Sequence, residues 1–293
     1  MEIMAWSRGR LAVLVVVAAL AGSGGSAGPS RDRRAVLPPG VTVESDVSYG
    51  PHPRQRMDVY LPRGARTGTL ILMVHGGAWR LGDKAQAAVV ENKVARWVAR
   101  GDVFVSANYR MLPQADPLVQ AEDVARALAA TQARAASWGA DPRRVILMGH
   151  SAGAHLVALL SARPALAAAQ GAKPWPGTVV LDSAALDVEG VMEGRHPPLY
   201  DQAFGGDHRF WRSTSPQHQL SAAARPLFLV CSSQRRDDPC GAARRFATAA
   251  AAVGVPATVL PQDLSHRAVN EDLGRPGAYT DAVEAFMAGL GLR

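Results

Sequence analysis

Apolar positions recur along the chain with two different periods. From about residue 41 onward, runs that alternate or are continuously apolar are separated by stretches in which apolar side chains return with the period of a helix. The first pattern predicts strands and the second predicts amphipathic helices. Their alternation predicts an α/β fold, with a mostly parallel central sheet and helices on both faces. We expect strands within residues 41–50, 55–62, 69–77, 102–110, 143–149, 177–184, 226–233 and 257–262, and helices within 84–101, 117–140, 152–163, 241–253 and 277–289.

Residues 187–220 interrupt this alternation. They lie between two expected strands and are rich in proline, glycine, histidine and aromatic residues. We interpret the segment as a small cap inserted over the edge of the sheet, and not as a second domain.

The N-terminal residues have a different composition. Arg8 and Arg10 precede the apolar stretch LAVLVVVAALAG, which is followed by the small residues SGGSAG. This arrangement is typical of a secretory signal peptide, whereas a membrane anchor needs about 20 apolar residues. We predict a cleaved signal peptide at 1–27, a linker at 28–40 and a main domain at 41–293. The mature protein would then be periplasmic or secreted, without a stable membrane span.

Charge and composition argue against several function classes. The formal net charge is +7, but the arginines are spread along the chain and only 6% of the residues are aromatic. With no recognised nucleic-acid-binding motif, we expect a solvated basic surface and no nucleic-acid partner. The histidines and the two cysteines lack metal-site spacing, and no glycine-rich phosphate loop is present. We therefore expect neither a metal nor a cofactor, and the oligomeric state stays open.

The pattern Gly-x-Ser-x-Gly occurs twice. Ser26 lies in the exit of the expected signal peptide, whereas Ser151 lies between an expected strand and an expected helix. A strand, a sharp turn and an immediate helix hold a serine with its Oγ exposed, as a nucleophile requires. The helix that begins at Ala152 also directs backbone N–H groups at a developing negative charge. We interpret Ser151 as the nucleophile and Ser26 as an accidental match.

A serine nucleophile needs a base and an orienting carboxylate, in the chain order Ser, Asp or Glu, His. We choose His266 as the base because it follows the last expected strand, where the histidine loop belongs. His155 is expected to pack within its helix. His196, His208 and His218 lie in the expected cap, where surface and substrate-contact roles are both open.

The carboxylate has several candidates. Asp237 and Asp238 are adjacent in the loop after the penultimate expected strand, and Asp182, at the end of the preceding strand, is the runner-up. Asp263 is too close to His266 along the chain to reach around the imidazole.

Donors for an oxyanion are expected in the loop of VHGGAWRLGDK, residues 74–84, which follows a buried strand. Backbone N–H groups there can act together with the N–H of Ala152. We expect His75 to brace this glycine loop by hydrogen bonding.

Four segments, YGPHPRQRMDVYLP, VHGGAWRLGDK, ANYRMLPQA and GHSAGAHL, together resemble the α/β-hydrolase esterases of the carboxylesterase and kynurenine-formamidase-like group. The resemblance runs from about Val47 to the C-terminus. It implies an α/β-hydrolase fold, oxyanion donors at Gly77, Ala78 and Ala152, and a D-x-x-V pattern at the acid. DDPC fits that pattern with Asp237 first, and we therefore choose Asp237 as the acid, although this loop lacks the family's usual glycine.

The leading function hypothesis is a serine esterase that cleaves a small ester through an acyl-enzyme intermediate. The resemblance also permits an arylformamidase, or a feruloyl or acetyl esterase. A catalytically silent hydrolase-fold binding protein is the alternative from another class. The complete set of serine, histidine, acid and glycine loop argues against it.

The two cysteines flank the expected acid loop. Cys231 precedes Asp237 and Cys240 follows it, nine positions from the first cysteine. In an exported chain such a pair can form a disulfide, which would hold the loop in place. We therefore predict a Cys231–Cys240 disulfide.

Overall fold

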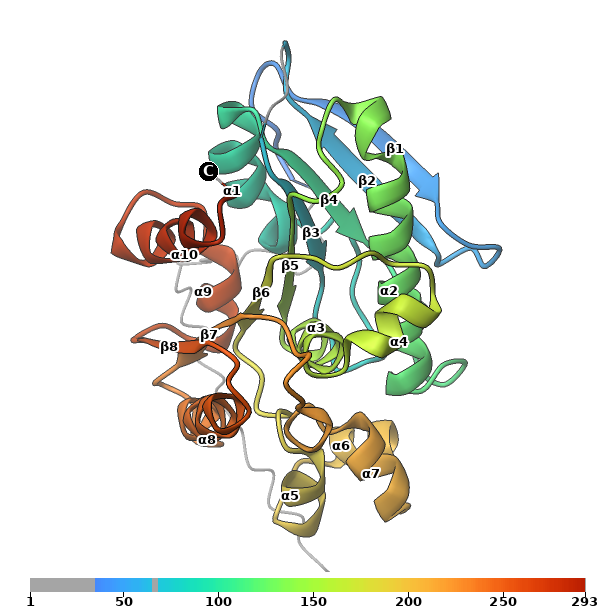
Figure 1. Cartoon of the computed structure of the whole chain (residues 1–293), viewed down its shortest axis with the longest axis vertical. Coiled ribbons are helices and arrows are strands. Elements are labelled where there is room, and N and C mark those ends of the chain that lie inside the picture. The colour runs from blue at the N-terminus through green and yellow to red at the C-terminus, as the bar shows by residue number, and fades with distance from the viewer. Residues whose placement is uncertain (1–34, 65–67, 293) are drawn as a thin grey trace, which may run out of the picture. The chain divides into compact units, whose positions relative to one another are not determined.

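An eight-stranded sheet forms the centre of the computed structural model, which describes residues 35–64 and 68–292 (Figure 1). The strand order is β1-β2-β4-β3-β5-β6-β7-β8. The expected signal peptide 1–27, Ser26 within it, and part of the linker 28–40 lie outside the described residues. The strands are β1 Thr42–Ser48, β2 Arg56–Leu61, β3 Leu70–Val74, β4 Val103–Ala107, β5 Val145–His150, β6 Gly177–Leu181, β7 Leu227–Ser232 and β8 Ala257–Gln262.

The sheet is mostly parallel, as the sequence predicts. β2 runs antiparallel to both β1 and β4, and every other neighbouring pair is parallel. Every residue of β3 is buried, and its side chains divide between two apolar cores: Leu72 faces one, and Ile71 and Met73 face the other. A continuously apolar strand is expected where helices cover both faces.

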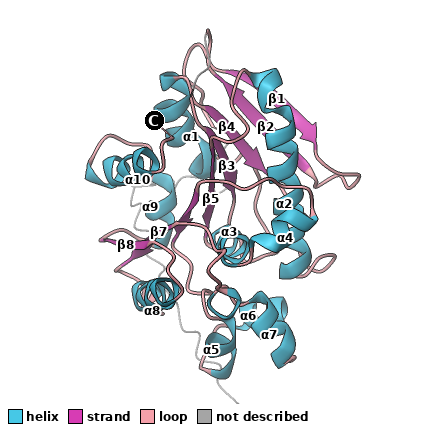
Figure 2. Ribbon diagram, in the orientation of Figure 1, coloured by secondary structure: helices cyan, strands magenta, loops and turns pink. Residues whose placement is uncertain are grey.

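Helices cover the two faces of the sheet (Figure 2). Side chains of α1, α9 and α10 contribute to one core, and those of α2, α3, α4 and α8 contribute to the other. The helices are α1 Ala87–Trp97, α2 Pro117–Arg134, α3 Ala152–Ala162, α4 Pro164–Ala169, α5 Val188–Glu193, α6 Pro198–Phe204, α7 His208–Thr214, α8 Pro239–Ala252, α9 His266–Glu271 and α10 Ala278–Gly289, with 3₁₀ turns η1 Val98–Arg100, η2 Ala135–Trp138 and η3 Gln217–Gln219.

Local sequence signals explain where α2 begins and ends. The Asp116 side chain accepts hydrogen bonds from the N–H groups of Leu118 and Val119, and Pro117 occupies the first turn. After η2, Gly139 takes the left-handed conformation that glycine adopts readily. The structure therefore confirms a helical stretch that stops at Gly139.

The segment expected as a cap, 187–220, folds into α5, α6, α7 and η3, and the three helices lie together in Figure 1. It attaches to the glycine loop after β3 through aromatic rings. The ring of Trp79 lies 5.6 Å from that of Tyr200 and 4.9 Å from that of Phe204. These contacts fix α6 over the edge of the sheet where β3 ends.

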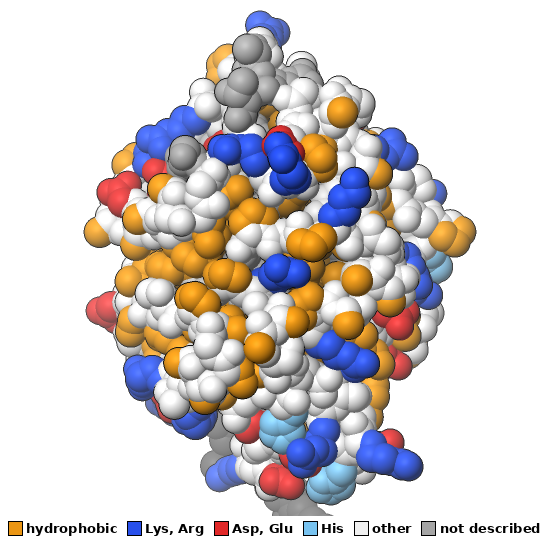
Figure 3. Space-filling view, in the orientation of Figure 1, with side chains coloured by type: hydrophobic (Ala, Val, Ile, Leu, Met, Phe, Trp, Pro, Cys, Tyr) orange, Lys and Arg blue, Asp and Glu red, His pale blue; other side chains and the backbone are white. Residues whose placement is uncertain are grey.

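The distribution of charge and the absence of a membrane-spanning helix among the described residues bear on the predictions about partners and membranes. Lys and Arg side chains are dispersed over the face seen in Figure 3, and several adjoin acidic side chains. No helix in residues 35–64 and 68–292 has the length and apolar content needed to cross a bilayer.

Candidate active site

Ser151 occupies the turn between β5 and α3, with φ 56° and ψ −118°. Glycine is required two residues before and two residues after Ser151, because other backbone segments approach both positions closely. A Cβ on Gly149 would lie 2.4 Å from the carbonyl oxygen of Gly153, and a Cβ on Gly153 would lie 2.4 Å from that of Val74. The N–H of Ser151 donates to the carbonyl of Leu181 at 2.9 Å, which ties the turn to the end of β6. The predicted strand-turn-helix setting of Ser151 is confirmed.

A chain of hydrogen bonds leads from the serine to a carboxylate. His266 Nε2 lies 3.0 Å from Ser151 Oγ, and His266 Nδ1 lies 2.6 Å from Asp182 Oδ2. When Nδ1 donates to the carboxylate, Nε2 is left as the acceptor for the serine proton. The three side chains are in the arrangement that activates a serine nucleophile.

Asp182 is fully buried and well supplied with partners. Its Oδ1 accepts a hydrogen bond from the N–H of Ser232 at 2.8 Å, in addition to the bond from His266 at Oδ2. Burial raises the pKa of the Asp182 carboxyl. The hydrogen bond from His266 and the nearby Arg235 charge outweigh this effect and lower the pKa below its ordinary value. Asp182 is therefore ionised at neutral pH.

The structure corrects the choice of Asp237 as the carboxylate at His266. Asp237 pairs instead with Arg235, whose Nε donates to Asp237 Oδ1 at 2.9 Å, and its side chain is 42% exposed. The physical reason lies in the register of the sheet. His150 and Leu181 are paired across β5 and β6, so Ser151 and Asp182 leave adjacent strands at the same level. Asp237 lies farther along the loop after β7.

The other acidic candidates have local roles. Asp238 caps α8 by accepting a hydrogen bond from the N–H of Gly241 at 2.8 Å. Asp263 accepts one from the side chain of Gln234 at 3.1 Å. Among the described residues, neither carboxylate is hydrogen-bonded to His266, in agreement with the exclusion of Asp263.

His150, which precedes the serine, contacts His266 and was not predicted from the sequence. Its ring lies against that of His266 at a centroid distance of 4.5 Å, and its Nε2 donates to the backbone carbonyl of His266 at 2.9 Å. Burial, followed by the neighbouring His266, lowers the pKa of His150 to about 3. The ring is therefore neutral and holds His266 by a hydrogen bond. Its position inside Gly-x-Ser-x-Gly was the available signal.

The glycine loop approaches the serine from β3. A Cβ on Gly76 would lie 2.8 Å from the Cβ of Ser151, so only glycine fits there. Gly77 has φ 121°, and the next residues, Ala78 and Trp79, also have positive φ. Such backbone is costly for residues with a Cβ, and it concentrates at functional sites.

A pocket of about 250 Å³ opens at the serine. Ala78 and Ala152 line it beside Ser151, whereas Gly77, the third expected oxyanion donor, is not among the lining residues. Cap residues close another side, including Leu199 and Tyr200. A larger surface hollow of about 590 Å³ contains no nucleophile; its lining residues are Pro51, His52, Pro53, Gln55, Arg110 and Arg126. We therefore take the smaller pocket as the candidate active site, because Ser151 and His266 line it and neither lines the larger hollow.

Two further histidines are buried braces. His75 Nδ1 bonds to the carbonyl of Gly76 at 2.7 Å, which confirms the expected bracing of the glycine loop. His155 Nδ1 accepts from Trp79 Nε1 at 3.2 Å, and its Nε2 donates to the carbonyl of Thr214 in α7 at 2.8 Å. Burial lowers the pKa of both histidines to about 4, so both are neutral at pH 7.

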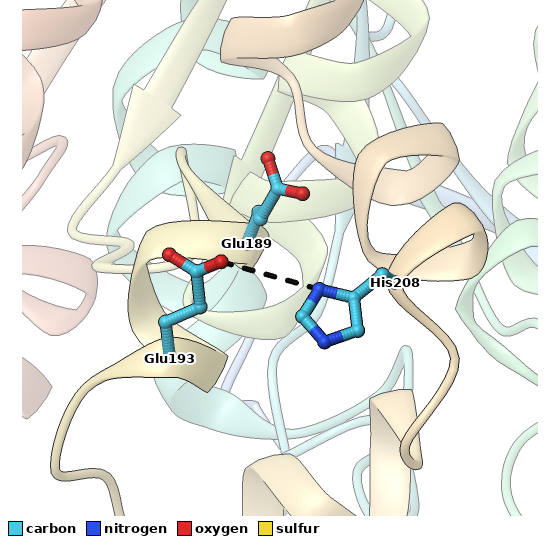
Figure 4. A group of neighbouring side chains, drawn as sticks. All are labelled: Glu189, Glu193 and His208. Atoms are coloured by element: carbon cyan, nitrogen blue, oxygen red, sulfur yellow. Dashed lines mark ion pairs between the residues drawn. The ribbon is translucent and has the colours of Figure 1, made fainter.

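One group in the described part of the chain has metal-ligand geometry. Glu189 and Glu193 of α5 and His208 of α7 present their ligand atoms within 4.8 Å of one another (Figure 4). Glu189 already pairs with Arg212 at 3.1 Å and with His218 at 3.2 Å. None of these residues lines the pocket, so the group is an ion-pair network within the cap.

The predicted disulfide between Cys231 and Cys240 is present, with a Cα–Cα distance of 5.1 Å. It joins the end of β7 to the first turn of α8. The loop that it closes carries Arg235 and Asp237, and Ser232, whose N–H bonds to Asp182, directly follows Cys231.

Comparison with known proteins identifies one matching family and several named relatives. The family model BD-FAE matches residues 57–171. The probable isoprenylcysteine alpha-carbonyl methylesterase ICMEL1 of Oryza sativa subsp. japonica is 39% identical over 114 residues, covering 38% of this chain and 26% of that protein. Esterase LipQ of Mycobacterium tuberculosis is 30% identical over 262 residues, covering 83% of this chain and 61% of that protein. The chain thus spans less than two thirds of the length of either relative.

Solved structures share the fold. Esterase B from Lactobacillus rhamnosis superposes with a TM-score of 0.70 at 19% identity, over 88% of this chain and 87% of that chain. At this identity the likeness concerns the fold alone.

Proposed function

Since this chain has an α/β-hydrolase fold and is similar to the BD-FAE family over residues 57–171 and to esterase LipQ, we propose that it is a serine hydrolase of carboxylic esters. Ser151 is the nucleophile, His266 the base and Asp182 the orienting carboxylate. The observation that carries the proposal is the hydrogen-bond chain through these three side chains, at the wall of a pocket.

The geometry suits an acyl-enzyme mechanism. Ser151 Oγ attacks the ester carbonyl while His266 Nε2, 3.0 Å away, takes its proton. The N–H groups of Ala152 and of the glycine loop at Gly77 and Ala78 are the proposed donors to the oxyanion. His266 then protonates the leaving alcohol, and a water molecule activated by the same nitrogen releases the acid.

Asp182 contributes through the orientation of the imidazole. Its bond to Nδ1 selects the tautomer in which Nε2 can accept a proton, and its negative charge stabilises the imidazolium that forms. The carboxylate stays ionised while it does so, and no metal or cofactor takes part in any of these steps.

A substrate panel tests the proposal. p-Nitrophenyl esters of increasing acyl length, run beside N-formylkynurenine, should give ester turnover that falls with acyl length, because the pocket holds only about 250 Å³. Ser151→Ala is the matched control and should abolish turnover. Turnover of the formyl amide alone would replace the esterase by an arylformamidase. Turnover of neither substrate class would favour a silent binding protein.

We also propose that the protein is exported. The N-terminal signal pattern and the Cys231–Cys240 disulfide support this, because disulfides persist in oxidising compartments. N-terminal sequencing of protein recovered from periplasm or medium should begin near residue 28. Recovery of the uncleaved chain only from the cytoplasm would contradict the proposal.

A further inference from the structure

We propose that Arg235 is a positioning residue for this chemistry: its fixed positive charge, held against Asp182 and His266 and balanced by Asp237, sets the pH range in which the imidazole acts as a base. The inference rests on the proposed esterase function. It assigns a role to the QRRDD segment, in which the expected catalytic acid does not contact the base.

The guanidinium touches both partners of the base-orienting pair. Arg235 Nη1 donates to Asp182 Oδ2 at 3.0 Å and to the backbone carbonyl of Asp182 at 3.2 Å. The same nitrogen lies 3.0 Å from His266 Nδ1. Asp182 Oδ2 is therefore shared between the imidazole and the guanidinium.

Asp237 holds the other edge of the guanidinium. Arg235 Nε donates to Asp237 Oδ1 at 2.9 Å, and Nη2 pairs with Oδ2. This bidentate pairing fixes the plane of the guanidinium as well as its distance from the Asp237 carboxylate. The Cys231–Cys240 disulfide closes the loop that carries both residues.

Burial strengthens the electrostatic interaction of Arg235 with its neighbours. Its side chain is 20% exposed and that of Asp182 is not exposed at all, so solvent screens this pair less than a surface pair. Arg235 and Asp237 both line the pocket beside Ser151 and His266. The group thus lies against the reacting atoms.

The sign of the effect follows from the charges. When His266 takes the serine proton, it becomes a cation beside an existing cation, which Arg235 opposes and Asp182 favours. Asp237 offsets Arg235 from its far side. Removing the guanidinium charge therefore makes His266 easier to protonate, and removing the Asp237 charge makes it harder.

One other titratable group near His266 changes charge in the working range: Lys93, from α1, donates to the backbone carbonyl of Asn270 in α9, and burial lowers its pKa to about 7. Lys93 is present in every variant compared below, so it does not affect the difference between them.

The remaining groups around His266 are uncharged or paired. His150, from β5, is neutral because burial lowers its pKa to about 3. Burial raises the pKa of Tyr200, from α6, to about 12, and that of Tyr279, from α10, well above its usual value. On α9 itself, the neighbouring Arg267 pairs with Glu271 at 2.7 Å.

The test is the pH dependence of kcat/KM for a small ester. Arg235→Gln should move the acid limb of the profile upward by about one pH unit, and Asp237→Asn should move it downward. Arg235→Lys keeps the charge and should leave the limb near its original position. Arg236→Gln is the matched control, because it removes the same charge from the adjacent exposed position of the loop.

A merely structural role would lower kcat and the melting temperature without moving the limb in opposite directions. Fluorophosphonate labelling of Ser151 checks that each variant is folded, and Asp237→Asn, at an exposed position, keeps the test valid if Arg235→Gln does not fold. Active wild-type enzyme with coincident acid limbs in Arg235→Gln or Asp237→Asn overturns this inference alone. Wild-type protein without ester turnover overturns the proposed function instead.

Discussion

Ser151 and Asp182 directly follow two paired strands, and both have φ 56°. For residues with a Cβ this left-handed backbone costs about 1–3 kcal/mol and persists only where the surroundings enforce it. Here the enforcing bonds are Ser151 N–H to Leu181 and Asp182 N–H to Val230, at 2.9 and 2.8 Å. The strained turns present both side chains to His266.

Asp182→Asn tests the assignment of the carboxylate. The fold should be retained, but kcat should fall by up to about 10⁴, the effect of the equivalent change in a serine protease, because the imidazole tautomer is no longer fixed. Asp237→Asn should change kcat far less at the pH optimum, since Asp237 contacts Arg235 and not His266. Steady-state kinetics with one small ester measure both. A larger loss in Asp237→Asn would restore the sequence-based assignment.

Gly153→Ala tests the close packing beneath the serine. A Cβ there would lie 2.4 Å from the carbonyl oxygen of Val74, so β3 and α3 must separate. Overpacking of this kind costs about 1–3 kcal/mol of unfolding free energy. Gly206→Ala, whose Cβ meets nothing within 4 Å, is the control. Equal urea midpoints for the two variants would refute the packing argument.

For single residues, the sequence predicted the roles of Ser151 and His266 and the pairing of the two cysteines, because short-range pattern and chain order specify them. It did not select Asp182 over Asp237. That choice depends on the register between β5 and β6 and on the Arg235 contact, which no local pattern contains.

The loop between β7 and α8 is the element that connects the disulfide to Asp182. Ser232, adjacent to Cys231, donates its N–H to Asp182, and Arg235 within the loop donates to the same carboxylate. The disulfide therefore holds two of the donors that orient Asp182.

Replacing both cysteines by serine should lower kcat several-fold but lower the free energy of unfolding only modestly. The closed loop is short, so the loss of unfolding free energy should be below the roughly 3 kcal/mol of a 15-residue loop. Release of the loop should lower kcat several-fold, because the bonds to Asp182 become less well ordered. Parallel measurement of kcat and the melting temperature checks this. An unchanged kcat with a large drop in melting temperature would show that the disulfide serves stability alone.

Element boundaries were predictable to different degrees. The strands and long helices followed from hydrophobic periodicity, and Gly139 marked a stop. The six-residue helix α9, which begins at His266, and the three short helices of 187–220 did not follow, because short helices depend on tertiary contacts more than on periodicity.

Across the whole molecule, three buried neutral histidines couple stability to pH. Burial lowers the pKa of His75 and His155 to about 4 and that of His150 to about 3, whereas the unfolded chain has values near 6.5. Between these values the unfolded state binds more protons. Stability is therefore lost as the pH falls from about 6.5 toward 4.

Urea unfolding at pH 7 and at pH 5 measures this coupling. Each histidine should contribute up to about 1.4 kcal/mol per pH unit within the window. His155→Gln, which can still accept from Trp79 and donate to Thr214, should remove one histidine's share of the slope. A free energy of unfolding that does not change between the two pH values would contradict the neutral, buried assignment.

We expect Ser151 to form a covalent acyl intermediate with the help of His266 and Asp182. Rapid mixing of the protein with p-nitrophenyl acetate, acid quenching and peptide mapping test it most directly. The predicted result is a burst of p-nitrophenol stoichiometric with enzyme and an acetyl group on Ser151, with neither in Ser151→Ala. An acetyl group on another residue, or a burst that persists in Ser151→Ala, would contradict the claim.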